Sequence, residues 1–374
     1  METNKLINVF YNQVKVGVLA LSDDKKIYFQ YDNDWLENGF SINPFSLPLK
    51  KGVFNSSKTY FEGLFGVFSD SLPDSWGKIL LNRMLKQNKI NIKDITILDK
   101  LAIVGTSGMG ALEYQPSYTL KQEIKTDLDF DSLSIECNKI LNSEFSDSLD
   151  ELFALGGSSG GARPKILTKI NEEEWIIKFN TKTDGINQGK MEYDYYLCAI
   201  DCGINMMEAK LLPSKISEGY FATKRFDRGN NKKIHMISVA ALLELDFGAP
   251  SLDYHSLMKL TKILTNNNFY DIEQMFKVMC FNVFAHNLDD HSKNFSFIYN
   301  EVEKNYRLSP AYDLTYSNTY FGEHTTSIDG HGKNPTEENL LNVGIKAGMK
   351  KEKCIEIKNN INTKENNRLR EYLK

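Results

Sequence analysis

Alternating apolar and polar residues near the N-terminus predict a small antiparallel sheet. The alternation covers residues 5–32 in the runs LINVFYN, VKVGVLAL and KKIYFQYD, and the pairs Asn12-Gln13 and Asp23-Asp24 separate the runs. A period of two places every second side chain on the same face of a strand, and polar pairs between such runs are typical of hairpin turns. Helical spacing follows between Phe61 and Lys86, and residues 106–114 return to loop and strand. These patterns favour a first α+β domain over residues 1–115.

The centre of the chain has a different character. Residues 155–170, LGGSSGGARPKILTKI, are typical of a glycine-rich loop that runs into an apolar strand, and residues 172–180 predict a second strand. Residues 191–204 show helical periodicity that ends at Gly203, and glycine is a common helix stop. We expect a second domain over residues 116–228.

The last part of the chain is mostly helical. The pattern is helical from about residue 251 to 286, and the segment MFKVMCFNVFAHN is apolar on all sides, which predicts a buried helix. A hairpin is expected where NFSFIYN is followed by NYRLSP, and a helix closes the sequence. We expect a third domain over residues 229–374.

Composition restricts the class of protein. Hydrophobic residues make up 41% of the 374 residues and charged residues 25%, which is ordinary for a soluble globular protein. A formal net charge of -4 argues against a general nucleic-acid or membrane binder. No apolar run approaches the roughly 20 residues that span a bilayer, and the N-terminus does not resemble a signal peptide. The five cysteines form no CxxC pair, so reduced thiols in a cytoplasmic protein are expected.

The glycine-rich loop is a candidate for phosphate binding. Glycines let backbone N–H groups approach a phosphate chain, because no side chain obstructs them. A Walker loop runs into a helix, whereas this loop runs through Arg163-Pro164-Lys165 into a strand, as in protein kinases. Taken alone, such a loop is weak evidence, and a flexible Gly/Ser linker is the alternative.

Lys178 interrupts the otherwise apolar strand WIIKFN. A buried lysine is costly without a partner, and in kinases a strand lysine contacts phosphates and pairs with a helical glutamate. Glu192, on the helix that follows, is the candidate partner. The alternative is a lysine on an edge strand that points into water.

The stretch FNVFAHNLDDHSKNFSF, residues 281–297, places a dense polar cluster between apolar flanks. Asp289 and Asn294 match the kinase catalytic-loop spacing D-x-x-x-x-N, in which the aspartate orients a hydroxyl and the asparagine holds a metal ion. The alternative is a cluster that caps a helix. A zinc site is not favoured, because no second histidine or cysteine lies at ligand spacing.

Asp313, in RLSPAYDLTYS, stands 19 residues after Asn294, where a second metal-binding aspartate is expected. A turn aspartate after a proline is the alternative. The order of these motifs carries more weight than any single one. Glycine-rich loop, strand lysine, helical glutamate, D-x-x-x-x-N and lone aspartate follow one another as in a bilobal protein kinase.

The chain also resembles the HipA family of serine/threonine kinases, the toxins of bacterial type II toxin–antitoxin modules. The resemblance covers almost the whole chain. It implies an α+β, bilobal, protein-kinase-like fold with a mostly helical C-terminal lobe. The segments that carry the resemblance are SDSLPDSWG (69–77), GGARPK (160–165), KRFDR (224–228), LDDHSKNFSF (288–297) and LSPAYDL (308–314).

By resemblance, Asp289 is the catalytic base, and Asn294 and Asp313 are Mg²⁺ ligands. Ser158, or the adjacent Ser159, is the serine that family members autophosphorylate. Asp290 follows the catalytic aspartate where the family usually has glycine, and we expect its carboxylate to stay in solvent, because burial beside Asp289 would raise the pKa of its neighbour. The resemblance further implies ATP contacts by Gly160, Gly161, Ala162, Arg163, Pro164, Lys165, Lys178, Lys224, Arg225, Phe226, His291, Ser292, Lys293 and Tyr312.

The leading interpretation is an ATP- and Mg²⁺-dependent protein kinase that inhibits growth as a toxin and silences itself by autophosphorylation. The resemblance implies a translation-related substrate, such as an aminoacyl-tRNA synthetase, and a helix-turn-helix antitoxin through which operator DNA is mainly bound. Two alternatives stay open. One is a catalytically silent corepressor that binds the antitoxin, and the other is a small-molecule kinase on the same fold.

Overall fold

The computed structural model describes residues 4–56, 59–118, 128–157, 161–229, 232–246, 248–319 and 321–373. The chain divides into two compact units. The first unit comprises Met1–Gly189, Leu211–Ile237 and Ala241–Glu244, and the second comprises Lys190–Lys210, Ser238–Ala240 and Leu245–Lys374. Both mix helices with strands, which confirms the expected α+β class. The domain boundaries expected near residues 115 and 228 stay predictions.

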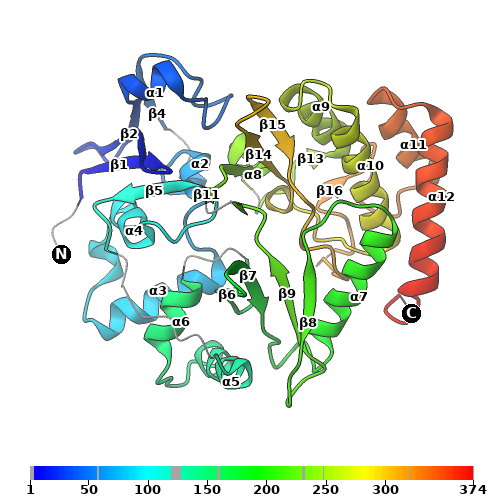
Figure 1. The fold of residues 1–374 in the computed structure, drawn as a ribbon, viewed down its shortest axis with the longest axis horizontal. Helices are drawn as coiled ribbons and strands as arrows, with labels where there is room; N and C mark the ends of the chain where they lie inside the picture. Colours follow the sequence, from blue (N-terminus) through cyan, green and yellow to red (C-terminus); the bar gives the residue numbers. More distant parts are fainter. Residues whose placement is uncertain are drawn as a thin grey trace. The chain divides into compact units, whose positions relative to one another are not determined.

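The predicted N-terminal meander is confirmed. Five strands form an antiparallel sheet in the order β4-β3-β2-β1-β5 (Figure 1). Asn12 and Gln13 form the first turn with φ of 45° and 71°, a left-handed conformation that asparagine tolerates well. The strands are β1 (Leu6–Tyr11), β2 (Val14–Leu21), β3 (Ile27–Tyr31), β4 (Val53–Asn55) and β5 (Leu112–Gln115).

Short helices accompany this sheet. The helical spacing before Lys86 corresponds to α3 (Ser75–Gln87), which buries the apolar side chains from Trp76 to Leu85. A capping box of Thr96 and Asp99 starts α4 (Ile97–Val104), because each side chain accepts a hydrogen bond from the other's backbone N–H. The other helical segments here are α1 (Asn33–Asn38), η1 (Thr59–Phe61), α2 (Gly66–Ser69) and η2 (Ile92–Asp94).

A second sheet follows the glycine-rich loop, in the order β6-β7-β9-β8. Trp76, Leu152 and Trp175 are fully buried in the core that joins this sheet to α3, α5 and α6. Of the helices in this core, α6, which runs into the glycines, was not predicted. The elements are α5 (Phe130–Leu141), α6 (Leu149–Gly156), β6 (Lys165–Ile170), β7 (Glu173–Lys178), β8 (Ala209–Leu212), β9 (Tyr220–Lys224), β10 (Arg228–Gly229) and β11 (Lys232–Lys233).

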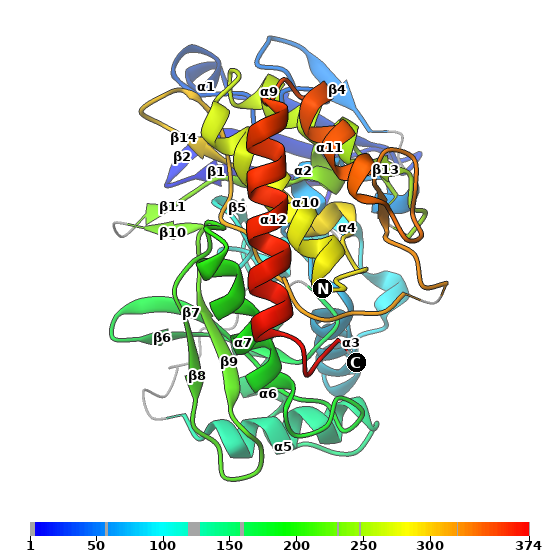
Figure 2. The same cartoon turned by 90° about the vertical axis from the view of Figure 1, so that its right-hand side faces the viewer.

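In the second unit, α10 (Phe269–Phe284) packs against α9 (Tyr254–Leu264), α11 (Glu337–Lys346) and α12 (Lys351–Arg368). Figure 2 shows α12 running the length of this helical layer. The predicted hairpin is formed by β14 (Ser296–Asn300) and β15 (Asn305–Leu308). The remaining elements, of which β12 and α8 belong partly to the first unit, are α7 (Gln188–Asp201), β12 (Met236–Ser238), α8 (Val239–Leu242), β13 (Leu252–Asp253), η3 (Ser292–Asn294) and β16 (Thr326–Ser327).

The prediction of a helix buried on all sides is confirmed for α10. Its residues from Met275 to Asn282 are buried except for Lys277. The helix therefore provides a rigid support for the loop that follows it. All five cysteines are buried and free. Over the described ranges, no helix is both long enough and apolar enough to cross a membrane.

Candidate functional site

The loop after α10 holds a cluster of polar residues in the second unit. His286, just beyond the helix, takes a φ of 53° and turns the chain away from the helix axis. The single turn η3 then forms, with the Asn294 N–H donating to the His291 carbonyl at 2.8 Å. The chain continues directly into β14. A buried helix and a strand thus fix the two ends of a short loop.

Within this loop, Asp289 and Asn294 are brought together. The Asn294 Nδ2 donates to the backbone carbonyl of Asp289 at 2.8 Å. This bond orients the Asn294 side chain and leaves its carbonyl oxygen as the atom available to a metal ion. The Asp289 side chain is 56% exposed, and His291 Nε2 lies 3.9 Å from its Oδ1, beyond hydrogen-bond distance. The carboxylate can therefore reach a substrate from solvent.

The expectation that Asp290 stays in solvent is wrong. Asp290 is 1% exposed. The Tyr254 hydroxyl and the Thr326 N–H donate to its carboxylate at 2.9 and 3.0 Å, and His324 Nδ1 lies 3.1 Å from Oδ2. A buried carboxylate is tolerated when hydrogen bonds replace its hydration. Burial, reinforced by the charge of Asp290, raises the pKa of Tyr254, so this hydroxyl stays a donor.

Asn287 links the loop to the segment that carries Asp313. Its Nδ2 donates to Asn282 Oδ1 at 2.9 Å and to the Asp313 carbonyl at 3.4 Å. Its Oδ1 accepts from the Ser317 hydroxyl at 2.7 Å, and the same hydroxyl accepts from the Asp289 N–H at 3.1 Å. The sequence interpretation assigned no role to Asn287 or Ser317. The position of Asn287, two residues before Asp289, was the available signal.

Asp313 takes a φ of 53°, a conformation uncommon outside glycine, asparagine and aspartate. Its neighbour Tyr312 donates its hydroxyl to the Lys293 carbonyl at 2.7 Å and lies 2.6 Å from the Ser296 hydroxyl. Tyr312 thereby ties the Asp313 segment to η3. Of the expected nucleotide contacts next to it, Ser292 is buried, and His291 and Lys293 are half-buried.

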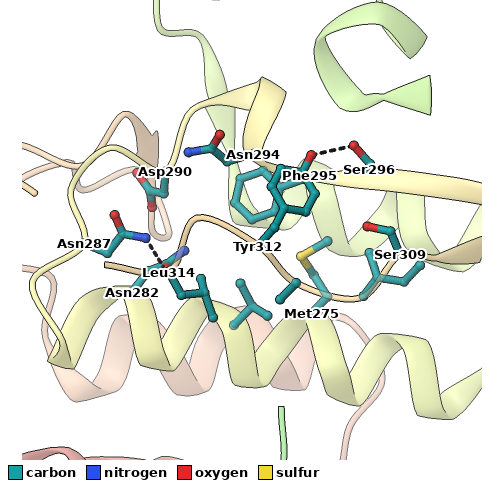
Figure 3. Close-up of a pocket in the computed structure, with 13 residues that line it drawn as sticks. Met275, Asn282, Asn287, Asp290, Asn294, Phe295, Ser296, Ser309, Tyr312 and Leu314 are labelled. Carbon is teal, nitrogen blue, oxygen red and sulfur yellow. Dashed lines mark hydrogen bonds between the residues drawn. The ribbon is translucent and has the colours of Figure 1, made fainter. Parts of the chain in front are cut away.

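A small pocket lies between α10 and this loop (Figure 3). Met275, Leu308 and Leu314 contribute apolar walls, and Asp290 and Asn294 contribute polar groups. Its volume of about 20 Å³ is room for water rather than for a nucleotide. The pocket shows that the loop packs closely on the helix beneath it.

The donor set of the second unit fits Mg²⁺. Mg²⁺ prefers oxygen ligands and is usually held by one or two carboxylates together with substrate phosphates. Asn294 offers an oriented amide oxygen and Asp313 a carboxylate, on segments joined through Asn287 and Tyr312. Across the described ranges, no group of three or more His, Cys, Asp or Glu residues could hold a metal by itself. The residues therefore suit a metal that arrives with phosphates.

In the first unit, the segment after the glycine-rich loop is firmly held. Gly161 takes a φ of +86°, which glycine adopts without strain. The Pro164 carbonyl accepts from the Phe179 N–H at 2.9 Å, and an Arg163 guanidinium nitrogen lies 3.3 Å from Asp184 Oδ1. Ser158, Ser159 and Gly160 lie outside the described residues.

Two lysines face each other at the start of the second sheet. Lys165 on β6 pairs in register with Lys178 on β7, and the Lys178 ammonium lies 5.5 Å from the centre of the Phe221 ring. Like charges at paired positions repel each other. The pairing therefore concentrates positive charge beside Gly161, which favours binding of an anion such as a phosphate chain.

The KRFDR segment forms ion pairs of its own. Lys224 pairs with Glu173, and the Arg225 guanidinium makes two hydrogen bonds to Asp227, at 2.9 and 2.7 Å. Burial opposes ionisation of Asp227, but the charges of Arg225 and Arg228 outweigh it and lower the pKa of this carboxyl to about 2. The ATP contacts expected of Lys224, Arg225 and the half-buried Phe226 stay predictions, and a contact by Arg225 would come from its backbone.

Glu192 is buried on α7 in the second unit. Lys178 belongs to the first unit, and the ion pair expected between them stays a prediction.

Comparisons with known proteins add the family context. A model of the HipA N-terminal domain matches residues 7–115, and a model of the HipA-like C-terminal domain matches residues 157–368. None of the curated proteins compared with the chain matches it.

Two solved structures resemble the chain. One is a complex of HipA, HipB and operator DNA from Shewanella oneidensis MR-1, with 16% identity, 98% of this chain and 90% of that chain covered, and a TM-score of 0.74. The other is the proinflammatory kinase CtkA of Helicobacter pylori, with 15% identity, 55% of this chain and 89% of that chain covered, and a TM-score of 0.37. The first match shows a HipA-like fold over nearly the whole chain and confirms the expected fold class.

Proposed function

The chain belongs to the HipA family, and we propose that it is an ATP- and Mg²⁺-dependent serine/threonine protein kinase that acts as the toxin of a toxin–antitoxin pair. The observation that carries the proposal is the loop after α10. It presents the exposed carboxylate of Asp289, bonds Asn294 to the Asp289 backbone, and is tied through Asn287 to Asp313. A merely structural loop has no need to expose one carboxylate while it orients the amide of Asn294 and holds the backbone of Asp313.

Each residue has a distinct role in this proposal. Asp289 accepts the hydrogen bond of the substrate hydroxyl and orients it for attack, as the aspartate of the kinase catalytic loop does. Asn294 and Asp313 hold Mg²⁺ through oxygen atoms. When bound, Mg²⁺ neutralises charge on the phosphates. Catalysis then depends on positioning and on electrostatic stabilisation of the transferred phosphoryl group.

The first unit contributes the phosphate contacts. The backbone of residues 160–165 and the ammonium groups of Lys165 and Lys178 provide N–H donors and positive charge. Autophosphorylation at Ser158 or Ser159 would add about two negative charges beside these groups. Repulsion from the ATP phosphates would then silence the kinase. A phosphomimetic Ser158→Asp variant with the ATP affinity of the wild type would contradict this self-silencing.

The proposed partners follow from the family and from the solved complex. That complex contains HipB and operator DNA together with HipA. For this chain we propose a helix-turn-helix antitoxin of the HipB type, operator binding mainly through that antitoxin, and a translation-related protein substrate such as an aminoacyl-tRNA synthetase. Incubation with candidate synthetases and labelled ATP tests the substrate, and labelling of none of them would exclude that class.

The kinase proposal is tested by phosphate incorporation, measured by intact-mass spectrometry and site mapping. Wild type, Asp313→Ala and Asp289→Ala are first dephosphorylated and then incubated with ATP and Mg²⁺. The wild type should gain phosphate on Ser158 or Ser159, EDTA should abolish the gain, and each variant should be slower by about 100-fold or more.

The control is Asp246→Ala, which removes an exposed carboxylate that accepts a local bond from the Gly248 N–H and should be phosphorylated like the wild type. Absence of phosphate from the dephosphorylated wild type would contradict the kinase proposal. A silent module that binds the antitoxin would then be the better interpretation.

A further inference from the structure

The stretch SLPDSWG (residues 71–77) contacts the glycine-rich segment although the two are far apart in sequence. Asp74 occupies the N-cap position of α3 with an extended backbone, yet its side chain makes no capping bond to its own helix. Its Oδ2 instead accepts from the Gly161 N–H at 3.2 Å, across 87 residues. An aspartate at an N-cap ordinarily satisfies a free N–H of its own helix, so its carboxylate has been diverted to another segment.

Gly161 is held from both sides of its peptide backbone. While Asp74 accepts from its N–H, the Trp76 N–H donates to its carbonyl at 3.3 Å. The Trp76 N–H belongs to the first turn of α3, where backbone N–H groups have no partner within the helix. Two bonds in opposite directions fix both the position and the orientation of Gly161. A residue with a side chain would be strained there, because Gly161 takes a φ of +86°.

The same tryptophan also holds the other end of the segment. The Trp76 indole Nε1 donates to the Lys165 carbonyl at 3.1 Å, at the first residue of β6. Trp76 is fully buried against Leu155, Ile166 and Trp175. Gly156 permits this approach, since a Cβ there would lie 2.5 Å from the Lys165 carbonyl oxygen. The residues from Gly161 to Lys165 are thus held at both ends from the start of α3.

We propose that Asp74 and Trp76 are positioning residues that preorganise the segment Gly161–Lys165 for the phosphates of ATP. The inference rests on the proposed kinase function and goes beyond it, because it gives the HipA N-terminal domain a role in nucleotide binding. Neither residue needs to touch the nucleotide. A segment that is in its binding conformation for only a fraction of the time binds with an affinity reduced by that fraction.

The decisive variant is Asp74→Ser. Serine is as good an N-cap as aspartate, so α3 should persist, but its side chain is too short to reach Gly161. We expect the dissociation constant for ATP to rise about tenfold, the effect of losing one hydrogen bond to a charged group. Asp74→Asn keeps an acceptor oxygen in place and should restore part of the affinity. Trp76→Phe removes only the indole donor to Lys165 and should weaken ATP binding to a smaller extent.

The matched control is Asp129→Ser, which changes the N-cap of α5 in the same unit. Its side chain caps only its own helix, through Asp131 and Ser132, so ATP affinity should be unchanged. Two readouts separate positioning from general destabilisation. First, the KM for ATP should rise in Asp74→Ser, while the rate at saturating ATP stays within about twofold of the wild-type rate. Second, the Gly161 amide should exchange hydrogen faster in Asp74→Ser than in the wild type, but not in the control.

The outcomes are distinguishable. An ATP affinity of Asp74→Ser equal to that of the wild type overturns the inference and leaves the kinase proposal intact. An equal loss of affinity in Asp74→Ser and Asp129→Ser also overturns it, because the effect would then be one of stability. A wild type that binds no ATP overturns both the inference and the kinase proposal.

Discussion

Asp289 and Asp290 show how far two adjacent residues of one type can differ in role. The side chain of Asp289 is more than half exposed, whereas that of Asp290 accepts hydrogen bonds from Tyr254 and Thr326 in the interior. The carboxylate of Asp289 is thus accessible to a substrate, whereas the carboxylate of Asp290 anchors the loop in the interior.

This difference predicts opposite effects of two alanine substitutions. Asp290→Ala leaves buried donors of Tyr254 and Thr326 unsatisfied and should lower the free energy of unfolding by about 3 kcal/mol. Asp289→Ala should change it by less than about 0.5 kcal/mol, because surface substitutions rarely cost more, while it slows phosphate transfer by about 100-fold or more. Urea unfolding of both variants provides the measurement.

Equal destabilisation by the two substitutions would contradict the assignment. Asp290→Asn serves as the control for shape, since it keeps an acceptor oxygen for one of the two donors and should cost less than alanine.

At the scale of elements, α12 carries a buried carboxyl group, that of Glu365, which its polar sequence does not predict. The helix is mostly polar, but Glu365 is only 2% exposed, and its Oε1 has no hydrogen-bond partner among the described residues. The charged form of Glu365 would raise the pKa of Tyr195 and Cys198 on α7, and it opposes ionisation of Cys202 just beyond that helix. Burial raises the pKa of the Glu365 carboxyl from an ordinary 4.5 to about 7.

The raised pKa makes stability depend on pH. Between pH 4.5 and 7 the folded chain keeps a proton on Glu365 that the unfolded chain has lost, so the free energy of unfolding falls as pH rises through this range. The loss is on the order of 3 kcal/mol, at about 1.4 kcal/mol per pKa unit. Glu365→Gln should therefore be more stable than the wild type at pH 8 and show a flatter pH profile, measured by urea unfolding from pH 4.5 to 8.

The exposed Glu352 of the same helix supplies the control. Glu352→Gln should leave the pH profile unchanged. A Glu365→Gln profile as steep as that of the wild type would show that another group causes the dependence.

The helices also differ in how well their sequences predict them. The buried helix α10 has a long apolar pattern, and the pattern alone identified it. By contrast, α6 has only eight residues and ends at the glycines. Its apolar pattern is too short to predict a helix next to a glycine-rich loop. Its helical form is favoured by packing of Leu152 and Leu155 against Trp76, a contact between segments distant in sequence.

At the scale of the whole molecule, charge bears on the partner proposal. The chain carries a formal net charge of -4, and affinity for DNA comes mainly from cationic groups that neutralise phosphates. An acidic protein therefore needs a partner to hold it firmly on DNA, unless its cationic groups gather on one face.

A binding experiment tests this expectation. At physiological salt, the purified chain alone should not retard a DNA fragment that carries the promoter of its own gene, whereas the chain with the helix-turn-helix protein encoded beside it should do so. An antitoxin–DNA complex without the chain is the control, and it should migrate faster than the complex of all three. Strong retardation by the chain alone would contradict DNA binding through the partner.

The sequence by itself determined the α+β class, the order of the main elements and the spacing of the candidate catalytic residues. These features depend on periodicity and on short motifs, which act over a few residues. Only the tertiary structure decided that Asp290 is buried, that Asn287 joins Asp289 to Asp313, and that Asp74 holds Gly161. Such contacts join residues that are distant along the chain. These contacts depend on how whole elements pack against one another, and a pattern that extends over a few residues does not determine that packing.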